Sequence, residues 1–231
     1  MAKKKNINEE ATVVDNLNSH LTKAGRTVAN NKKIIYICVG VVAVVAAFVL
    51  SYIFIYHNPR LQNSWEAYNQ VLLKQAKGEI TNDTVAAQEF QKISTNFSSM
   101  PAGNVAALAA AQAYYNVKNY DAAIKLLEKM DLSEPILESQ SQALLGDCYV
   151  NKKQYDKAID CFNKAIKIAD NNPQLVPGYL IKEANIYNAQ KKYDKSLACY
   201  EQIQKEYPHF QFGNGLDIEF YIEREKAFAG K

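Results

Sequence analysis

The chain has 231 residues, of which 48% are hydrophobic and 22% charged, so it is long and apolar enough for one or two folded domains and is not a disordered chain. Its nine glycines and six prolines are too few for a collagen-like or proline-rich architecture or for a turn-dense β-sandwich. The net charge of +3 is unevenly divided, because residues 1–33 carry seven basic against three acidic residues and the rest carries 20 against 21. A body without a concentrated cationic face argues against nucleic acid as a partner.

The N-terminal segment, residues 1–33, is predicted to be a partly amphipathic tail. Val14, Leu17, Leu21 and Val28 recur at helical spacing and would form a thin apolar stripe. A helix with this stripe would lie against the inner membrane surface or a partner. A partly disordered juxtamembrane tail is the alternative.

Residues 34–56 are predicted to be a transmembrane anchor. The run from Ile34 to Tyr56 has 23 residues without a charge. As a helix it would span roughly 34 Å, against a hydrocarbon core of about 30 Å. The run is longer than the apolar part of a signal peptide and is not followed by an A-x-A-like cleavage site, so we expect it to stay uncleaved in the lipid bilayer. A buried core helix is the alternative.

The charges that flank this run predict its orientation. Lys32 and Lys33 adjoin it on the N-terminal side, with five more basic residues behind them, whereas Arg60 is the first basic residue on the other side. Because cytoplasmic flanks carry the excess of lysine and arginine, the N-terminus is expected in the cytoplasm and the C-terminal body across the membrane.

The body, residues 57–231, repeats a helical pattern. A Tyr-Asp pair recurs at Tyr120, Tyr155 and Tyr193, at intervals of 35 and 38 residues. This spacing is close to a unit of about 34 residues built from two helices, and the pattern resembles the tetratricopeptide repeat family. The repeats are expected at about 103–135, 138–173 and 177–208.

Two further elements are expected at the ends of the repeats. A degenerate unit is predicted over 62–101, and a helix over 216–229 would cap the exposed end of the stack. The predicted fold is therefore all-α: a single transmembrane helix, an α-solenoid of about four helix pairs, and a C-terminal capping helix.

Small residues mark where the paired helices would cross closely. They recur at equivalent positions in the repeats: Ala111, Gly146 and Ala184 on the first helices, and Ala123, Ala158 and Ser196 on the second. Pro135 and Pro208 are expected to close their units by ending a helix, and Pro173 is expected to do the same three residues late in the middle repeat. The second helix of the degenerate unit is expected to end at Pro101.

Residues suited to catalysis or metal binding are not grouped in any known pattern. The three histidines have no metal-ligand spacing, and no glycine-rich phosphate loop or nucleophile motif is present. We therefore predict a protein that is not an enzyme and has no catalytic residue, cofactor or metal; a membrane-anchored enzyme is the alternative from another class. Cys148, Cys161 and Cys199 are interpreted as small packing residues, with disulfide or redox roles as the alternative.

A binding groove is predicted on the first helix of each repeat, because stacked repeats curve and these helices line the concave side. A mixed apolar and amide surface of this kind would hold unfolded or emerging polypeptide. Leu108 and Ala143 stand where the carboxylate-clamping tetratricopeptide domains have basic or amide residues, which argues against a cytosolic co-chaperone. A solvated or self-associating surface is the alternative. The candidate groove residues are Leu108, Gln112, Tyr115, Asn116, Asp147, Val150, Ile181, Asn185 and Asn188.

Anchor, orientation and repeats together resemble the YfgM-type family, in its Bacteroidetes-like branch. The local pieces that carry this resemblance are Asn30-Asn31-Lys32-Lys33-Ile34-Ile35 and the closing Tyr221-Ile222-Glu223-Arg224-Glu225-Lys226-Ala227. The resemblance implies a bacterial inner-membrane protein with a periplasmic C-terminal domain. It further implies an ancillary subunit of the Sec translocon that works with a membrane-anchored periplasmic chaperone of the prolyl-isomerase class on emerging secretory proteins. A scaffold for envelope or outer-membrane protein assembly is the alternative function.

Overall fold

The computed structural model describes residues 31–130, 132, 134–213 and 215–230, and every regular element among them is a helix. The predicted stripe of Val14, Leu17, Leu21 and Val28 lies outside these residues. The chain divides into two units, one ending at Pro59 and the other beginning at Arg60. The elements are α2 (Lys32–Ser51), η1 (Tyr52–His57), α3 (Asn58–Ala76), α4 (Asp83–Asn96), α5 (Pro101–Asn116), α6 (Tyr120–Leu127), α7 (Pro135–Asn151), α8 (Tyr155–Ala169), α9 (Val176–Ala189), α10 (Tyr193–Glu206) and α11 (Ile218–Ala229).

The N-terminal unit contains an apolar helix of membrane-spanning length. Its most apolar window has a mean hydropathy of 2.8 and no buried residue. The segment η1 is π-helical, and the Asn58 N–H after it donates to the carbonyl of Ile53, five residues back. The rings of Tyr52 and Tyr56 lie 5.5 Å apart on this segment.

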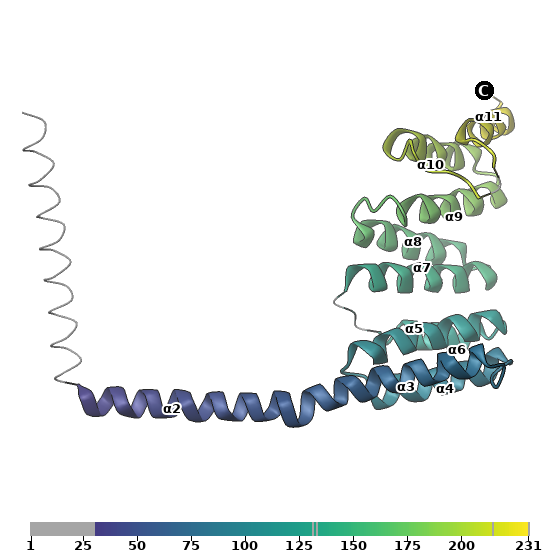
Figure 1. The fold of residues 1–231 in the computed structure, drawn as a ribbon. Coiled ribbons are helices and arrows are strands. Elements are labelled where there is room, and N and C mark those ends of the chain that lie inside the picture. The colour runs from purple at the N-terminus through teal and green to yellow at the C-terminus, as the bar shows by residue number, and fades with distance from the viewer. Residues whose placement is uncertain (1–30, 131, 133, 214, 231) are drawn as a thin grey trace, which may run out of the picture. The chain divides into compact units, whose positions relative to one another are not determined.

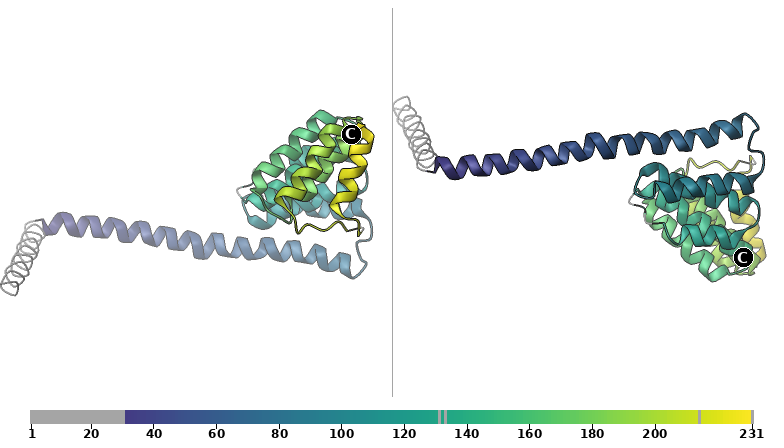
Figure 2. Two further views of the ribbon diagram at one scale, coloured as in Figure 1. Left: turned by 90° about the horizontal axis from the view of Figure 1, so that it is seen from above. Right: turned by 90° about the horizontal axis from the view of Figure 1, so that it is seen from below.

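The C-terminal unit is a stack of TPR-like helix pairs in which consecutive helices pack against one another (Figure 1). Within this unit, Figure 2 shows the helices overlying one another when the stack is seen from its two ends. At its beginning, α3 packs on α4 through Tyr68 and Phe90, whose ring centroids are 5.4 Å apart. The prediction of an all-α fold, with a long apolar helix followed by TPR-like helix pairs, is confirmed.

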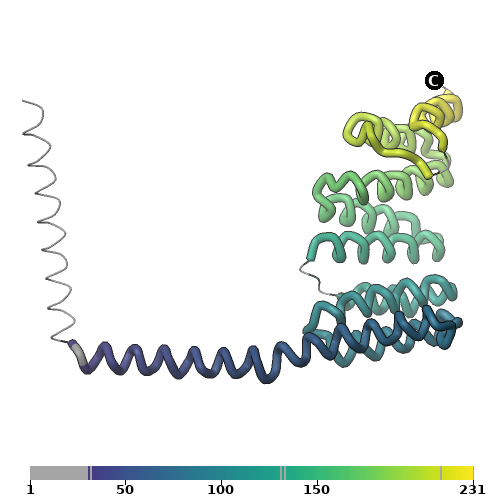
Figure 3. Tube along the Cα trace, viewed as in Figure 1, coloured from purple at the N-terminus to yellow at the C-terminus, as the bar shows by residue number. Residues whose placement is uncertain are grey.

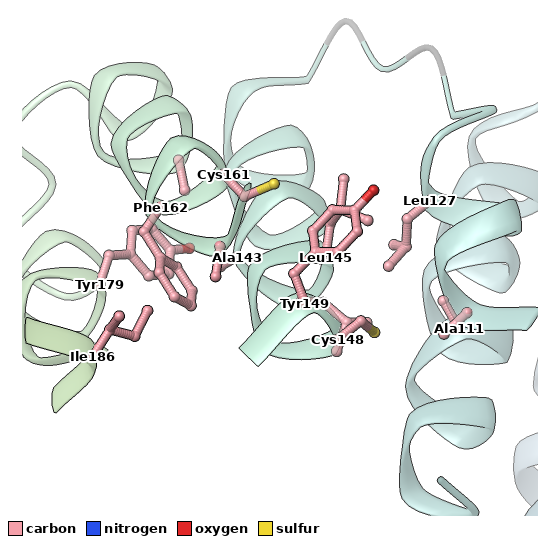
Figure 4. Packing of buried hydrophobic residues seen from close by; sticks show 14 residues of the cluster. Ala111, Leu127, Ala143, Leu145, Cys148, Tyr149, Cys161, Phe162, Tyr179 and Ile186 are labelled. Atoms are coloured by element: carbon pink, nitrogen blue, oxygen red, sulfur yellow. The ribbon is translucent and has the colours of Figure 1, made fainter. Parts of the chain in front are cut away.

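The core runs along the stack as three clusters of buried apolar residues. The central cluster joins α5 through α9. Figure 4 shows Phe162, Tyr179 and Ile186 at one end of this cluster and Ala111 and Leu127 at the other. Because each cluster joins neighbouring pairs, every pair supports the next one along the stack.

The small residues predicted at the helix crossings are all buried, as close crossing requires. Gly146 gives the clearest case, because an added Cβ would lie 2.7 Å from the ring of Phe162 on α8. Any side chain here would therefore push α7 and α8 apart. The other five residues, Ala111, Ala123, Ala158, Ala184 and Ser196, are fully buried.

The turns inside the three central pairs share one geometry. Lys118, Lys153 and Lys191 each adopt a left-handed conformation, with φ of 62°, 58° and 59°. In the first turn, Lys118 N–H donates to Tyr115 O and Asn119 N–H donates to Tyr114 O, both at 2.9 Å. The same two bonds recur in the other two turns. This is the Schellman pattern, in which glycine is the usual left-handed residue.

The prolines require a correction. Pro101 and Pro135 do not close units: they are the first residues of α5 and α7. The first helical position needs no N–H donor and has the φ that proline prefers, so proline starts these helices. Pro208 does lie beyond the end of α10, which stops at Glu206.

The last helix, α11, packs against α10. The connection between them runs back along the pair formed by α9 and α10 (Figure 3). Aromatic rings hold this connection in place: Phe212 stacks on Tyr221 at 4.4 Å, and Tyr221 stacks on Tyr200 at 5.2 Å. On α11 itself, Ile222 and Glu225 are the buried residues, whereas Phe228 is exposed.

Candidate partner-binding face

The predicted groove residues lie on α5, α7 and α9 and differ in exposure. Gln112, Asn116 and Asn185 are exposed. The other six are half-buried: Leu108, Tyr115, Asp147, Val150, Ile181 and Asn188. Ala143, which the sequence places beside them, is only 5% exposed and belongs to the central core cluster.

Four of these residues also pack against the core, which corrects their assignment to an open groove alone. Leu108, Tyr115 and Val150 contact the central cluster, and Ile181 contacts the C-terminal cluster. The reason is geometric: the first helix of a pair faces its neighbour in the next pair as well as solvent. Replacing these side chains would therefore lower the stability of the stack as well as the affinity for a partner.

Hydrogen bonds tie the first helices to one another along this face. Asn151 of α7 donates to the hydroxyl of Tyr115 on α5 at 3.1 Å, and its amide oxygen accepts from the hydroxyl of Tyr120, at the start of α6, at 3.1 Å. Between α9 and α11, Asn188 donates to both carboxylate oxygens of Glu225 at 2.8 and 2.9 Å. Glu225 is fully buried, and its carboxylate also forms an ion pair with Arg224 at 2.6 Å. The opposite charge and the amide hydrogen bonds together compensate its removal from water.

An ion pair joins α7 to α9 in the middle of this face. Lys182 donates to both carboxylate oxygens of Asp147 at 2.7 Å, and the two side chains are 39% and 23% exposed. Burial raises the pKa of Asp147 above its ordinary value, and the ammonium of Lys182 opposes that shift. The Lys182 ammonium also lies 5.8 Å from the ring centroid of Phe162. The two opposite charges meet within the protein, so this part of the face is close to neutral.

A pocket of about 260 Å³ opens beside the ion pair. Its walls come from α7, α8 and α9, and its lining residues are Asp147, Val150, Tyr155, Phe162, Lys182, Asn185, Ile186 and Ala189. The structure thus brings together three of the nine predicted residues. Gln112 and Asn116 lie on α5 and hydrogen-bond to each other at 3.0 Å.

Sequence reasoning missed Lys182, Asn151 and the pocket residues of α8. Helical spacing identifies one face of one helix, but Lys182 and Asp147 are 35 residues apart and meet only through the stack. Asn151 could have been predicted, because it follows the groove residue Asp147 by four positions and so lies on the same face of the helix.

The cysteines are buried thiols without disulfide bonds in the C-terminal unit. Burial raises the pKa of Cys148 and Cys199 to about 12 and that of Cys161 to about 11. A thiol held protonated in this way is a poor nucleophile and metal ligand. Among the described residues, no three histidine, cysteine, aspartate or glutamate side chains are placed to hold a metal ion.

Comparison with known proteins identifies the repeats. Residues 140–172 and 180–209 each match the tetratricopeptide repeat, and these segments contain most of α7 with α8 and of α9 with α10. The chain therefore carries tetratricopeptide repeats behind a long apolar helix. Repeats of this class serve as scaffolds that bind other proteins.

Proteins similar to this chain include one relative and two solved structures. An uncharacterized protein of Aquifex aeolicus (strain VF5) is 35% identical over 85 residues, which is 37% of this chain and 47% of that protein. The chain thus matches about half the length of that relative. A crystal structure of MamA protein aligns with a TM-score of 0.55 at 16% identity, covering 74% of this chain and 83% of that chain. A second, of MamA, aligns with a TM-score of 0.53 at 18% identity, covering 68% and 82%. At these identities the likeness concerns the fold.

Proposed function

We propose that this protein is a membrane-anchored, protein-binding scaffold whose stack of repeats faces the periplasm. The observation that carries the proposal is the pairing of two features in one chain: an apolar helix without buried residues, and tetratricopeptide repeats whose first helices expose amide side chains. The helix keeps the stack at the membrane, and the exposed amides offer donors and acceptors to a polypeptide backbone.

The anchor and its orientation follow from charge. The run from Ile34 to Tyr56 is long enough to cross a bilayer, and the seven basic residues before its charge-free core would hold the N-terminus in the cytoplasm. The apolar helix then lies in a bacterial inner membrane, and the C-terminal unit lies in the periplasm.

The proposed partners are the Sec translocon and a membrane-anchored periplasmic chaperone of the prolyl-isomerase class, acting on emerging secretory proteins. The support is the resemblance to the YfgM-type family in the tail-plus-anchor segment and the closing helix. An anchored stack with a polar, nearly neutral face suits transient contacts with many unfolded chains, because no strong charge selects among them.

Co-purification tests this proposal. The full-length protein, tagged at its C-terminus, is isolated from native membranes in mild detergent, and bound proteins are identified by mass spectrometry. We expect translocon subunits and a membrane-anchored chaperone. Subunits of an outer-membrane assembly machine in their place would contradict the translocon assignment and support the alternative scaffold.

A triple variant tests the face itself. Gln112→Glu, Asn116→Asp and Asn185→Asp add charge at exposed positions and keep the shape of each side chain, so the fold is expected to survive. The co-purified partners should fall at least about tenfold, because each added carboxylate must be desolvated when a polypeptide binds.

The matched control carries the same three exchanges on exposed residues of α3, α4 and α8: Asn69→Asp, Gln88→Glu and Asn163→Asp. This control should keep its partners. Equal retention by both triple variants would show that the face of the first helices is not the binding surface.

A further inference from the structure

The pocket between α7, α8 and α9 has an apolar floor and a polar rim. Phe162 is fully buried and Ile186 is 3% exposed, so these two side chains form the floor. Asn185 and Ala189 are exposed and therefore lie at the rim. A ligand entering here meets an amide first and aromatic and aliphatic carbon below it.

The charges at the pocket are already satisfied. Both oxygens of Asp147 accept from Lys182 at 2.7 Å, and the ammonium of Lys182 lies over the Phe162 ring. A carboxylate entering the pocket would have to compete with Asp147 for this ammonium, and a cation would have to compete with Lys182. The arrangement therefore favours an uncharged group over a charged one.

The size of the pocket selects its occupant further. At about 260 Å³ it is smaller than the roughly 300–1,000 Å³ of sites that enclose a whole small molecule. It is large enough for one aliphatic or aromatic side chain. The exposed amide of Asn185 stands beside the opening and has a donor and an acceptor for the peptide group that carries such a side chain.

We infer that this pocket binds a single large apolar side chain, of the leucine or phenylalanine type, from an extended polypeptide whose backbone is held by Asn185. The inference rests on the proposed function as a scaffold and names what that scaffold recognises: a polypeptide segment with an isolated apolar residue in uncharged surroundings.

A photo-reactive peptide tests the inference on the full-length protein in detergent. The probe is a peptide of glycine, serine and threonine with one diazirine analogue of leucine at its centre. After irradiation, mass spectrometry should place the adducts on the pocket residues. The unlabelled leucine peptide should compete with the probe at least about tenfold better than peptides with alanine, aspartate or lysine at the centre.

Two alanine variants form a matched pair. Ala189→Leu fills the pocket from its exposed rim and should lower the adduct yield about tenfold. Ala198→Leu makes the same exchange at an exposed position of α10 outside the pocket and should leave the yield unchanged. Thermal unfolding of both variants checks that they fold.

The outcomes separate this inference from the proposed function. Adducts scattered over the surface, an unchanged yield in Ala189→Leu, or equal competition by the aspartate and lysine peptides would overturn the inference. If partners still co-purify with the wild-type protein in that case, the scaffold function stands and only the pocket assignment is wrong. A specific peptide adduct without any co-purified partner would contradict the scaffold function instead.

Discussion

Gly146 lets α7 and α8 approach each other closely, because it has no side chain. We expect Gly146→Ala to destabilise the stack, because the new Cβ would lie 2.7 Å from the ring of Phe162, which is fully buried and has little room to move. Overpacking of this kind costs about 1–3 kcal/mol, which exceeds the roughly 0.5–1 kcal/mol that alanine gains over glycine inside a helix. The measurement is the thermal midpoint by far-UV circular dichroism, expected to fall by about 2–4 °C per kcal/mol.

Gly178 supplies the matched control, because it also lies in a helix, α9, but nothing would contact its added Cβ within 4 Å. Gly178→Ala should raise the midpoint slightly. A midpoint that rises in both variants would show that the two helices are not held at the distance described here.

Glu183 is 5% exposed, and its Oε1 has no hydrogen-bond partner among the described residues. Burial raises its pKa to about 7, so the folded protein binds a proton that the unfolded chain releases near the ordinary glutamate pKa. This contribution to stability is fully present below the unfolded pKa and is lost as the pH rises through about 7. Above that pH the buried charge costs on the order of 3 kcal/mol.

Glu183→Gln removes this titration while keeping the shape of the side chain. We expect the variant to be more stable than the wild-type protein at pH 8, with a difference that shrinks steadily toward pH 5, as measured by urea unfolding across this range. Exposed Glu201→Gln is the control and should show no such trend. A difference that does not change with pH would contradict the assignment of this titration to Glu183.

At the scale of the elements, the Schellman turns place a lysine where glycine fits better. We expect Lys153→Gly to stabilise the protein by about 1 kcal/mol, because its φ of 58° strains an L side chain but not glycine. Lys153→Ala is the control at the same position and should give no gain, since alanine has the same restriction. Chemical denaturation measures both variants, and equal effects of glycine and alanine would show that the backbone here is not left-handed.

The sequence predicted those features of the helices that depend on local pattern. The recurring Tyr-Asp pair starts α6, α8 and α10, where an acidic residue in the first turn suits the helix dipole. Pro101 and Pro135 were misassigned because proline both ends one helix and suits the first position of the next, and local pattern does not distinguish the two.

The candidate site was less predictable, because it depends on pairs of residues far apart in the chain. Helical spacing assigned Asp147, Val150 and Asn185 to the groove, and the structure places them in one pocket. Spacing gave no sign of Lys182, which meets them only through the stacking of α9 on α7. Asn188, one of the predicted groove residues, also donates to Glu225 of α11, 37 residues away, which the spacing gave no reason to expect. A solenoid repeats its local pattern, but the contacts between repeats follow from details that spacing alone does not contain.

At the scale of the whole molecule, the charge asymmetry predicts topology. Protease added to spheroplasts should digest the C-terminal unit and spare the tail, because the basic residues before Ile34 retain the N-terminus in the cytoplasm. Epitope tags at the two ends report the two sides, and lysed cells serve as the control in which both tags are lost. A C-terminal tag protected in intact spheroplasts would contradict the orientation and, with it, the periplasmic scaffold.

The burial of the three cysteines in the stack has a practical consequence for labelling. Cys148, Cys161 and Cys199 are shielded from solvent, and Cys38 lies within the apolar helix. A cysteine introduced at an exposed position, such as Asn116 or Asn185, would therefore react with a water-soluble maleimide while the native thiols stay intact. Fluorophores or spin labels could thus be attached to the otherwise natural chain, and distances along the stack could be followed as partners bind.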